Sequence, residues 1–151
     1  TILVRPAVAG DAEAVAGLAS ELRAHLGDPL HHLTPAVIRR DGFGPDAQFE
    51  LLVAEVAGAV VGYAIFYEVY EPAYAARGFY MADLCVGAGM RRRGIGRRLI
   101  DGLSEAARRR GRTFIWWHTR PDNAEALAFY QGLGLDFIEP FVVHVRILPP
   151  G

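Results

Sequence analysis

The sequence contains no lysine, because all 16 of its basic residues are arginines. A lysine that forms a Schiff base with a substrate, or that acts as a general base, is therefore excluded. The single cysteine, Cys85, cannot form an internal disulfide, and one cysteine does not fit a cysteine-based zinc site. A lone cysteine suits a reducing compartment, so we expect a cytoplasmic protein without a metal.

The chain also lacks a large net charge and a long apolar run. Its formal net charge is −1, which argues against a general electrostatic grip on the phosphates of nucleic acid. The runs Arg91–Arg93 and Arg108–Arg110 are more typical of solvated helix faces. No apolar run reaches the length of about 20 residues that a membrane-spanning helix needs, and the N-terminal residues do not resemble a signal peptide. We expect neither nucleic acid nor a membrane as a partner.

The chain has enough hydrophobic residues to form one core. The chain has 151 residues, of which 52% are hydrophobic, so we expect a single domain over residues 1–151. Strand-like segments alternate with helix-like ones. Strands are predicted at residues 2–5, 51–56, 60–69, 79–86, 114–118 and 141–148. Helices are predicted after Asp11, after Thr34, over residues 94–110, and from a capping box at Asp122 and Glu125 to about Leu133. This order predicts an α/β or α+β fold.

The most informative segment runs from Ala82 to Leu99, with the sequence ADLCVGAGMRRRGIGRRL. It has the pattern of a strand, a glycine-rich turn and a helix start. A helix start offers unpaired N–H groups and a partial positive charge, which suit a phosphate. Gly94 and Gly96 let a ligand approach the backbone closely. Positive charge is added where a polyphosphate would lie by Arg91, Arg92, Arg93 and Arg97.

Other phosphate-binding motifs fit this segment poorly. A dinucleotide fingerprint needs a third glycine where Leu99 stands, and an ATP-binding P-loop needs a lysine. The alternative without a ligand is that the glycines close a turn and the arginines face water.

The pattern Arg91-x-x-Gly94-x-Gly96, between a strand and an amphipathic helix, resembles the acetyl-CoA signature of the GNAT N-acetyltransferases. The resemblance continues to Asn123 and Tyr130, which match the second motif of the superfamily. The chain is similar to the spermidine/spermine (diamine) and thialysine N-acetyltransferase branch. Supporting segments are Arg5-Pro6-Ala7, Asp41-Gly42-Phe43-Gly44, Val53-Ala54-Glu55, Asp83 before Leu84-Cys85-Val86, and Phe129-Tyr130. The resemblance implies a mixed, twisted, mostly antiparallel sheet flanked by helices, acetyl-CoA as cosubstrate and a homodimer.

The resemblance also implies roles for individual residues. The pantetheine arm of acetyl-CoA would pair with backbone groups of Leu84, Cys85 and Val86. The pyrophosphate would be held by N–H groups of Arg92, Arg93, Gly94, Ile95, Gly96 and Arg97. Asn123 would contact the cosubstrate, and Tyr130 would protonate the departing CoA thiolate. A tyrosine on a helix is otherwise most often an amphipathic core residue.

The acceptor side departs from the branch. The polyamine enzymes carry a glutamate just before Asp83, and here that position is Ala82. Their acidic residue near the end of the first helix corresponds to Leu26, and its tyrosine neighbour to His25. An amine is protonated at neutral pH and must lose a proton before it attacks. Some other group, or a chain of waters, must therefore serve as the base.

Glu68, with Glu71 as a weaker candidate, is our hypothesis for recognition of the amine. A hairpin centred near Tyr74 would pair Phe66 with Ala82 and would put Glu68 on the same face as Ala82. A carboxylate there would attract a cationic amine. A slip of one residue would reverse the face, and the alternative is two exposed glutamates beside a turn.

We therefore predict an N-acetyltransferase in which a primary amine of a small cationic acceptor attacks acetyl-CoA directly. Alternatives are a protein or other amine as acceptor, or a CoA-binding sensor without turnover, which the alanine at position 82 suggests and Tyr130 argues against. Cys85 is more consistent with a small buried residue than with an acyl-carrying nucleophile. His31-His32 lacks the helical spacing of metal ligands, and His118 is either structural or part of the substrate rim.

Overall fold

The computed structural model describes residues 1–27, 31–134 and 144–150. The chain divides into two compact units, residues 1–118 and 119–151. The strands of the first unit are β1 (Ile2–Pro6), β2 (Glu50–Val56), β3 (Ala59–Glu71), β4 (Ala76–Val86) and β5 (Ile115–Trp116). Its helices are η1 (Ala9–Asp11), α1 (Ala12–His25), α2 (Pro35–Gly42), η2 (Ala88–Met90) and α3 (Ile95–Arg109). The second unit contains α4 (Ala124–Gly132).

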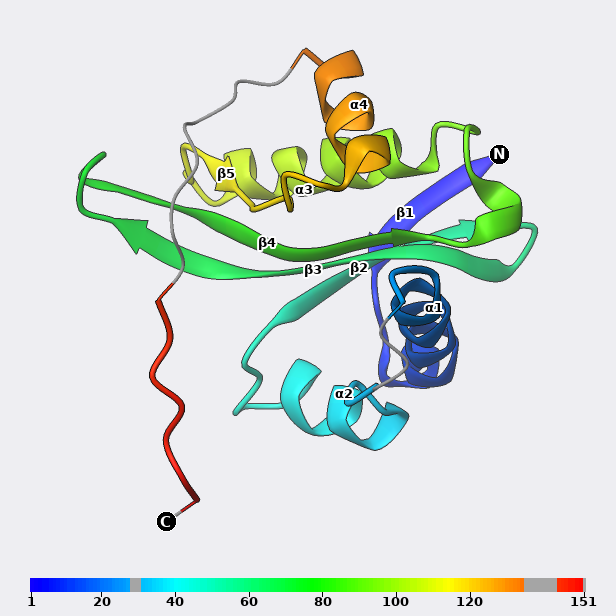
Figure 1. The fold of residues 1–151 in the computed structure, drawn as a ribbon, viewed down its shortest axis with the longest axis horizontal. Helices are drawn as coiled ribbons and strands as arrows, with labels where there is room; N and C mark the ends of the chain where they lie inside the picture. Colours follow the sequence, from blue (N-terminus) through cyan, green and yellow to red (C-terminus); the bar gives the residue numbers. More distant parts are fainter. Residues whose placement is uncertain (28–30, 135–143, 151) are drawn as a thin grey trace. The chain divides into compact units, whose positions relative to one another are not determined.

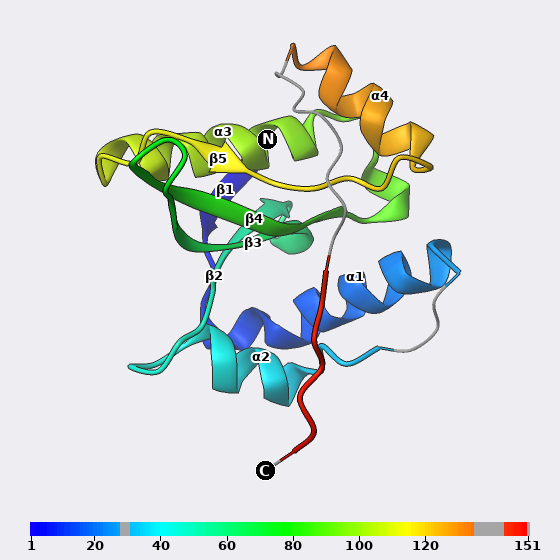
Figure 2. The ribbon, with the colours of Figure 1, turned by 60° about the vertical axis from the view of Figure 1, so that its left-hand side comes forward.

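The strands of the first unit form one sheet in the order β1-β2-β3-β4-β5. Neighbouring strands are antiparallel from β1 to β4, and only the β4–β5 pair is parallel. Helices α1 and α2 lie on one face of the sheet and α3 lies on the other (Figures 1 and 2). The predicted mixed, mostly antiparallel sheet flanked by helices is confirmed.

Each face of the sheet carries its own apolar layer, because side chains alternate along a strand. On the face of α1 and α2, the buried cluster takes Tyr63 and Ile65 from β3 and Cys85 from β4. Phe66 and Phe79 stack on the opposite face, with their ring centroids 4.9 Å apart. Helix α3 packs on that second face through the buried residues Ile95, Leu99, Ile100, Leu103, Ala106 and Ala107.

The predicted elements of the first unit are present, with two differences in length. The β3–β4 ladder continues to the pair Glu71–Ala76, so the turn covers residues 72–75 and not the predicted 70–78. The strand predicted at residues 114–118 is limited to β5, since only Ile115 and Trp116 pair with β4. In the described part of the chain, no helix is both long and apolar enough to cross a membrane.

The caps of α1 and α2 differ in how well the sequence predicted them. Thr34 caps α2 as expected, because its Oγ1 accepts the N–H of Val37 at 3.2 Å. Asp11 occupies the position before α1, but its side chain does not cap that helix. Its carboxylate accepts hydrogen bonds from the Arg5 guanidinium at 2.8 Å and from the Val8 N–H at 2.8 Å. Asp11 therefore ties the start of α1 to β1.

The cap predicted for α4 is wrong by one residue. Asn123 is the capping residue, and its Oδ1 accepts the N–H of Ala126 at 3.1 Å. Asp122 instead pairs with the guanidinium of Arg120 at 3.1 Å. An asparagine accepts this bond as well as an aspartate does, so either residue type suits the position.

The last predicted strand, at residues 141–148, begins outside the described residues. The described residues 144–148 are not in a strand. Val145 and Ile147 are 76% and 79% exposed. Alternating apolar residues suggest a strand, but only hydrogen bonds to a neighbouring strand create one.

Candidate active site

One edge of β4 is open where the sequence places the ligand arm. β3 pairs along the other edge of β4, whereas β5 pairs only with Phe79 and Tyr80. Among the described residues, no strand pairs with the β5 side of β4 from Met81 to Val86. Backbone N–H and C=O groups need partners, and an extended ligand can supply them as an added strand does. The predicted pantetheine contacts, Leu84, Cys85 and Val86, all lie along this open edge.

A β-bulge lies at the start of the open edge. Ile65 pairs with Asp83, while the next residue of β3, Phe66, pairs with Met81. Ala82 is therefore the extra residue and has no partner on β3. The predicted pairing of Phe66 with Ala82 is wrong, because a bulge shifts the register by one residue at this point.

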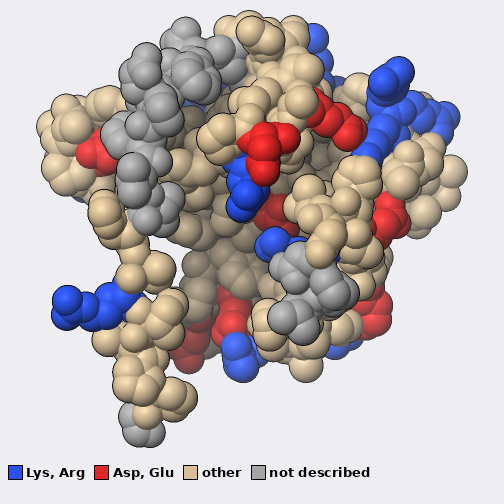
Figure 3. Space-filling model, in the orientation of Figure 1, with Lys and Arg blue, Asp and Glu red and all other residues tan. Residues whose placement is uncertain are grey.

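The open edge leads into the start of α3. The turn before the helix contains two residues with left-handed backbone, Arg92 at φ 62° and Gly94 at φ 80°. Gly94 stands at the N-cap of α3 and has no side chain to cap the helix. The N–H groups of the first turn are thus free of a side-chain cap and can bind an anion. Arginine side chains gather at this end of α3 (Figure 3), where Arg92, Arg93 and Arg97 are exposed.

Gly62 holds the start of α3 close to the open edge. It pairs with Val86, the last residue of β4. A Cβ on Gly62 would lie 2.9 Å from the carbonyl oxygen of Cys85, and 3.3 Å from side-chain carbons of both Ile95 and Leu99. The missing side chain therefore allows the helix and the strand end to meet. The two predicted contact regions for one cosubstrate lie side by side.

A half-buried carboxyl group stands beside the open edge. The Tyr63 hydroxyl donates a hydrogen bond of 2.7 Å to Oδ2 of Asp83. Burial raises the pKa of Asp83, although the Tyr63 hydrogen bond and the positive charge of Arg23 oppose that shift. A carboxylate with a raised pKa is a better acceptor for the proton of an ammonium group. Asp83 was not among the site residues predicted from the sequence, although an aspartate inside an apolar strand is an unusual feature.

Cys85 is buried, as the sequence predicted. Its thiol donates to the carbonyl oxygen of Leu18 at 3.5 Å. Burial, together with the negative charge of Asp83, raises the pKa of the Cys85 thiol to about 12. The thiolate is the nucleophilic form of cysteine, so this side chain is not suited to carry an acyl group.

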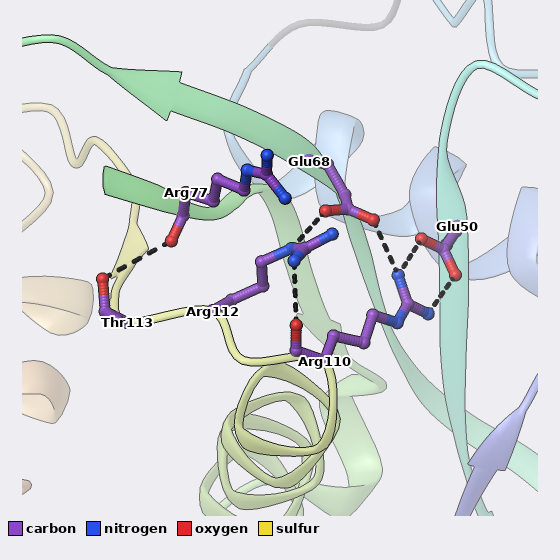
Figure 4. A network of polar contacts seen from close by, with 6 residues as sticks. All are labelled: Glu50, Glu68, Arg77, Arg110, Arg112 and Thr113. Carbon is purple, nitrogen blue, oxygen red and sulfur yellow. Dashed lines mark hydrogen bonds and ion pairs between the residues drawn. The ribbon is translucent and has the colours of Figure 1, made fainter. Parts of the chain in front are cut away.

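Glu68 lies on the other face of the sheet from Asp83. Its carboxylate accepts hydrogen bonds from Nε of Arg112 at 2.5 Å and from Nη1 of Arg110 at 3.4 Å (Figure 4). Arg110 also binds the carboxylate of Glu50 at 2.7 and 2.8 Å. The hydrogen bond from Arg112 keeps the pKa of Glu68 low. The proposed role of Glu68 in amine recognition loses its geometric basis. Arg110 is exposed, as the arginine run suggested, but it also forms ion pairs with Glu50 and Glu68.

The other predicted site residues are spread over β3, α1 and α4. The carboxylate of Glu71 accepts the N–H of Ala73 at 2.9 Å and so supports the turn after β3. His25 is the last residue of α1. In the second unit, Tyr130 lies on α4 and is half-buried. Within residues 1–27, 31–134 and 144–150, no three His, Cys, Asp or Glu side chains gather as a metal site requires.

Comparison with known sequences identifies the family. The sequence model described as "Acetyltransferase (GNAT) family" matches residues 17–135. The thialysine N-epsilon-acetyltransferase of Sus scrofa is 29% identical over 144 residues, covering 89% of this chain and 84% of the relative. The spermidine/spermine N(1)-acetyltransferase-like protein 1 of Homo sapiens is 33% identical over 113 residues, covering 69% of this chain and 16% of the relative.

Solved structures share the fold. A ribosomal-protein-alanine N-acetyltransferase from Brucella melitensis superposes with a TM-score of 0.79 at 22% identity, covering 97% of this chain and 100% of the other. An aminoglycoside acetyltransferase from an uncultured soil metagenomic sample, in complex with trehalose, gives a TM-score of 0.80 at 18% identity, covering 98% and 97%. The resemblance seen in the glycine-rich segment thus extends to the whole fold, and the chain belongs to the acetyltransferase (GNAT) family and is an acyltransferase.

Proposed function

We propose that this enzyme transfers the acetyl group of acetyl-CoA to a primary amine of a small cationic acceptor, with residues 1–151 acting as one N-acetyltransferase domain. The observation that carries the proposal is the open edge of β4, from Met81 to Val86, which leads into the uncapped start of α3. Such an edge suits an extended amide-containing arm, and the helix start suits a pyrophosphate. The relatives named for thialysine and spermidine/spermine favour a small amine.

In the proposed reaction, the nitrogen lone pair of the neutral amine attacks the thioester carbonyl carbon. A backbone N–H between Leu84 and Val86 would polarise that carbonyl and stabilise the oxyanion of the tetrahedral intermediate. The carbon–sulfur bond then breaks, and Tyr130 would protonate the departing thiolate. The proton that the attacking nitrogen loses as the amide forms would return Tyr130 to its neutral form. Asn123 would contact the cosubstrate through the side chain that also caps α4.

We assign the initial proton transfer to Asp83, which replaces Glu68 in this role. Its carboxyl group borders the open edge and is hydrogen-bonded to Tyr63. Because burial raises the pKa of Asp83, the proton affinities of carboxylate and ammonium become better matched. Ala82 cannot take this part, since it has no titratable group.

A pair of matched glycine variants tests the cosubstrate site. Gly94 and Gly111 flank the two ends of α3, have φ values of 80° and 70°, and have nothing within 4 Å of an added Cβ. Valine at either position causes similar backbone strain, but only Gly94→Val alters the proposed pyrophosphate site. We expect Gly94→Val to weaken CoA binding at least about tenfold, or about 1.4 kcal/mol, and Gly111→Val to leave it nearly unchanged. Calorimetry with CoA measures both, and equal losses would contradict the placement.

A panel of amines then tests the reaction. Free CoA release is measured for diamines, lysine-like amino acids, aminoglycosides and peptide amines. A sensor would bind acetyl-CoA but would form no free CoA from it with any of these amines. A protein acetyltransferase would act on peptide amines alone.

Tyr130→Phe separates catalysis from structure, because it removes only the hydroxyl group. We expect unchanged CoA affinity and a turnover lower by about 100-fold or more, as is usual for loss of a general acid. A large loss of CoA binding would instead indicate that Tyr130 is a structural residue.

We also propose a cytoplasmic homodimer, on the strength of the resemblance to the polyamine and thialysine branch. Light scattering of the purified chain measures its mass in solution, and a monomer at micromolar concentration would contradict the dimer.

A further inference from the structure

A group of aromatic side chains continues past the end of the core on the α1 face of the sheet. We call it the aromatic wall, and it consists of Tyr67, Tyr80, Trp116 and His118. The ring centroids of Tyr67 and Tyr80 lie 5.4 Å apart, those of Tyr80 and His118 5.4 Å, and those of Trp116 and His118 5.7 Å. Each spacing falls in the usual range for aromatic contacts. The wall is thus one continuous surface across β3, β4 and the segment that contains β5.

The register places the wall next to Asp83. Tyr67 pairs with Tyr80, and Tyr80 pairs with Trp116, so these rings share one face. The pair Ile65–Asp83 lies on the same face, because Ile65 stands two residues before Tyr67 on β3. Two residues of strand span ~7 Å. A carboxyl group and a row of rings are therefore neighbours on the face where the acceptor would meet the open edge of β4.

The wall is partly exposed, and two of its polar atoms are bonded to each other. The Tyr80 hydroxyl and Nδ1 of His118 are hydrogen-bonded to each other at 2.8 Å. Tyr67 is 38% exposed, and Tyr80 and Trp116 are half-buried. Several adjacent rings at a protein surface are a usual mark of a binding site. Ring faces attract another ring or the positive end of a ligand.

The charges near the wall favour a monoamine over a polyamine. A second ammonium group would need a second carboxylate on this face beside the wall. Glu71 shares the face, but it stands four residues beyond Tyr67 at the end of β3, and its carboxylate accepts the N–H of Ala73. Glu68 lies on the opposite face with Arg110 and Arg112, and the carboxylate of Glu21 accepts the N–H of Ala88 at 2.7 Å. A sugar would need several polar partners for its hydroxyl groups, and the Tyr80 hydroxyl and Nδ1 of His118 already bond to each other.

We propose that the acceptor is an arylalkylamine, whose amino group lies beside Asp83 and whose aromatic ring packs on the wall. A short carbon linker between ring and nitrogen matches the separation of Asp83 from the Tyr67–Tyr80 pair. This inference rests on the proposed acetyl transfer and specifies its substrate class. It differs from the substrates named for the relatives, thialysine and spermidine/spermine.

The test compares phenethylamine and tryptamine with spermidine and thialysine, with CoA release as the readout. We expect the arylalkylamines to have the highest kcat/KM. Tyr67→Leu should raise the KM for phenethylamine about five- to tenfold, with kcat and the constants for spermidine little changed. Tyr70→Leu, at a residue 60% exposed on the other face of β3, is the control and should change nothing.

The outcomes separate this inference from the function on which it rests. Acetylation of spermidine in preference to phenethylamine overturns the arylalkylamine and leaves the acetyltransferase intact. A loss at Tyr67→Leu that is equal for all four amines also overturns it, because a general structural effect would explain that result. If none of the four amines leads to release of CoA, both the proposed function and this inference are overturned. CoA binding by calorimetry, unchanged in each variant, shows that the variants are folded.

Discussion

Gly62→Ala is the substitution whose effect the structure defines most sharply. The new methyl group would lie 2.9 Å from the carbonyl oxygen of Cys85 and 3.3 Å from Ile95 and Leu99. Real Cβ atoms do not approach a backbone oxygen so closely, so β4 or β3 must move. The side chains of α3 must also shift by a few tenths of an ångström. Because the oxygen belongs to the backbone, no change of rotamer relieves the contact.

The expected cost follows from what overpacking does elsewhere. Extra methyl groups in well-packed cores cost about 1–3 kcal/mol. For a domain of this size, each 1 kcal/mol lowers the melting temperature by about 2–4 °C. The contact lies at the end of β4, so the same shift should separate the open edge from the start of α3. We expect Gly62→Ala to weaken CoA binding as well, although no atom of Gly62 need touch the cosubstrate.

Denaturant unfolding and calorimetry with CoA measure the two effects. The matched control is Gly17→Ala in α1, where an added Cβ meets nothing within 4 Å. Alanine is the better helix former, so this control should gain about 0.5–1 kcal/mol and should bind CoA normally. If Gly62→Ala is as stable as the wild type and binds CoA equally well, the close approach of strand and helix is not what positions the site.

Further predictions concern the titrating and charged side chains. Burial raises the pKa of Asp83 above its ordinary value of 3.8. Between the unfolded-state pKa and this raised value the folded state binds more protons, so the melting temperature of the wild type should fall as the pH rises through that range. Asp83→Asn should remove this part of the pH dependence and abolish acetylation. The Cys85 thiol, with its pKa raised to about 12, should react with a thiol reagent at neutral pH only after unfolding. Glu68→Gln breaks the ion pair with Arg112 and should cost less than about 1 kcal/mol of stability while leaving turnover unchanged; a large loss of turnover would restore its role in amine recognition.

The sequence was most informative where the relevant residues are close together in the chain. The apolar spacing of Ile95, Leu99 and Leu103 predicted α3, and these three residues are buried. Gly94 was expected to serve close approach to the backbone, and it takes a left-handed conformation at the N-cap. A strand, a turn and a helix start in sequence order form one local unit. Its geometry therefore needs no information from distant parts of the chain.

Prediction from the sequence failed where contacts between residues far apart in the chain determine the role of a side chain. Glu68 reaches Arg110 and Arg112, which follow it by 42 and 44 residues. No local pattern in the sequence indicates these ion pairs, so Glu68 was interpreted as a carboxylate available to the acceptor. Its face was assigned from a regular hairpin, and the period of two along a strand makes that assignment sensitive to a single inserted residue.

The inserted residue, Ala82, determines how the site is arranged. In a regular strand Tyr80 and Asp83 would point to opposite faces, because they are three positions apart in the sequence. Their partners Tyr67 and Ile65 are only two residues apart and share a face, so the bulge brings Tyr80 and Asp83 to the same side of the sheet. It also lies where β5 ceases to pair and the edge of β4 opens. One unpaired alanine thus aligns the aromatic wall, the half-buried carboxyl group of Asp83 and the open edge. The position at which the chain departs from the polyamine branch is therefore also the one that couples its proposed acceptor site to its proposed acetyl-CoA site.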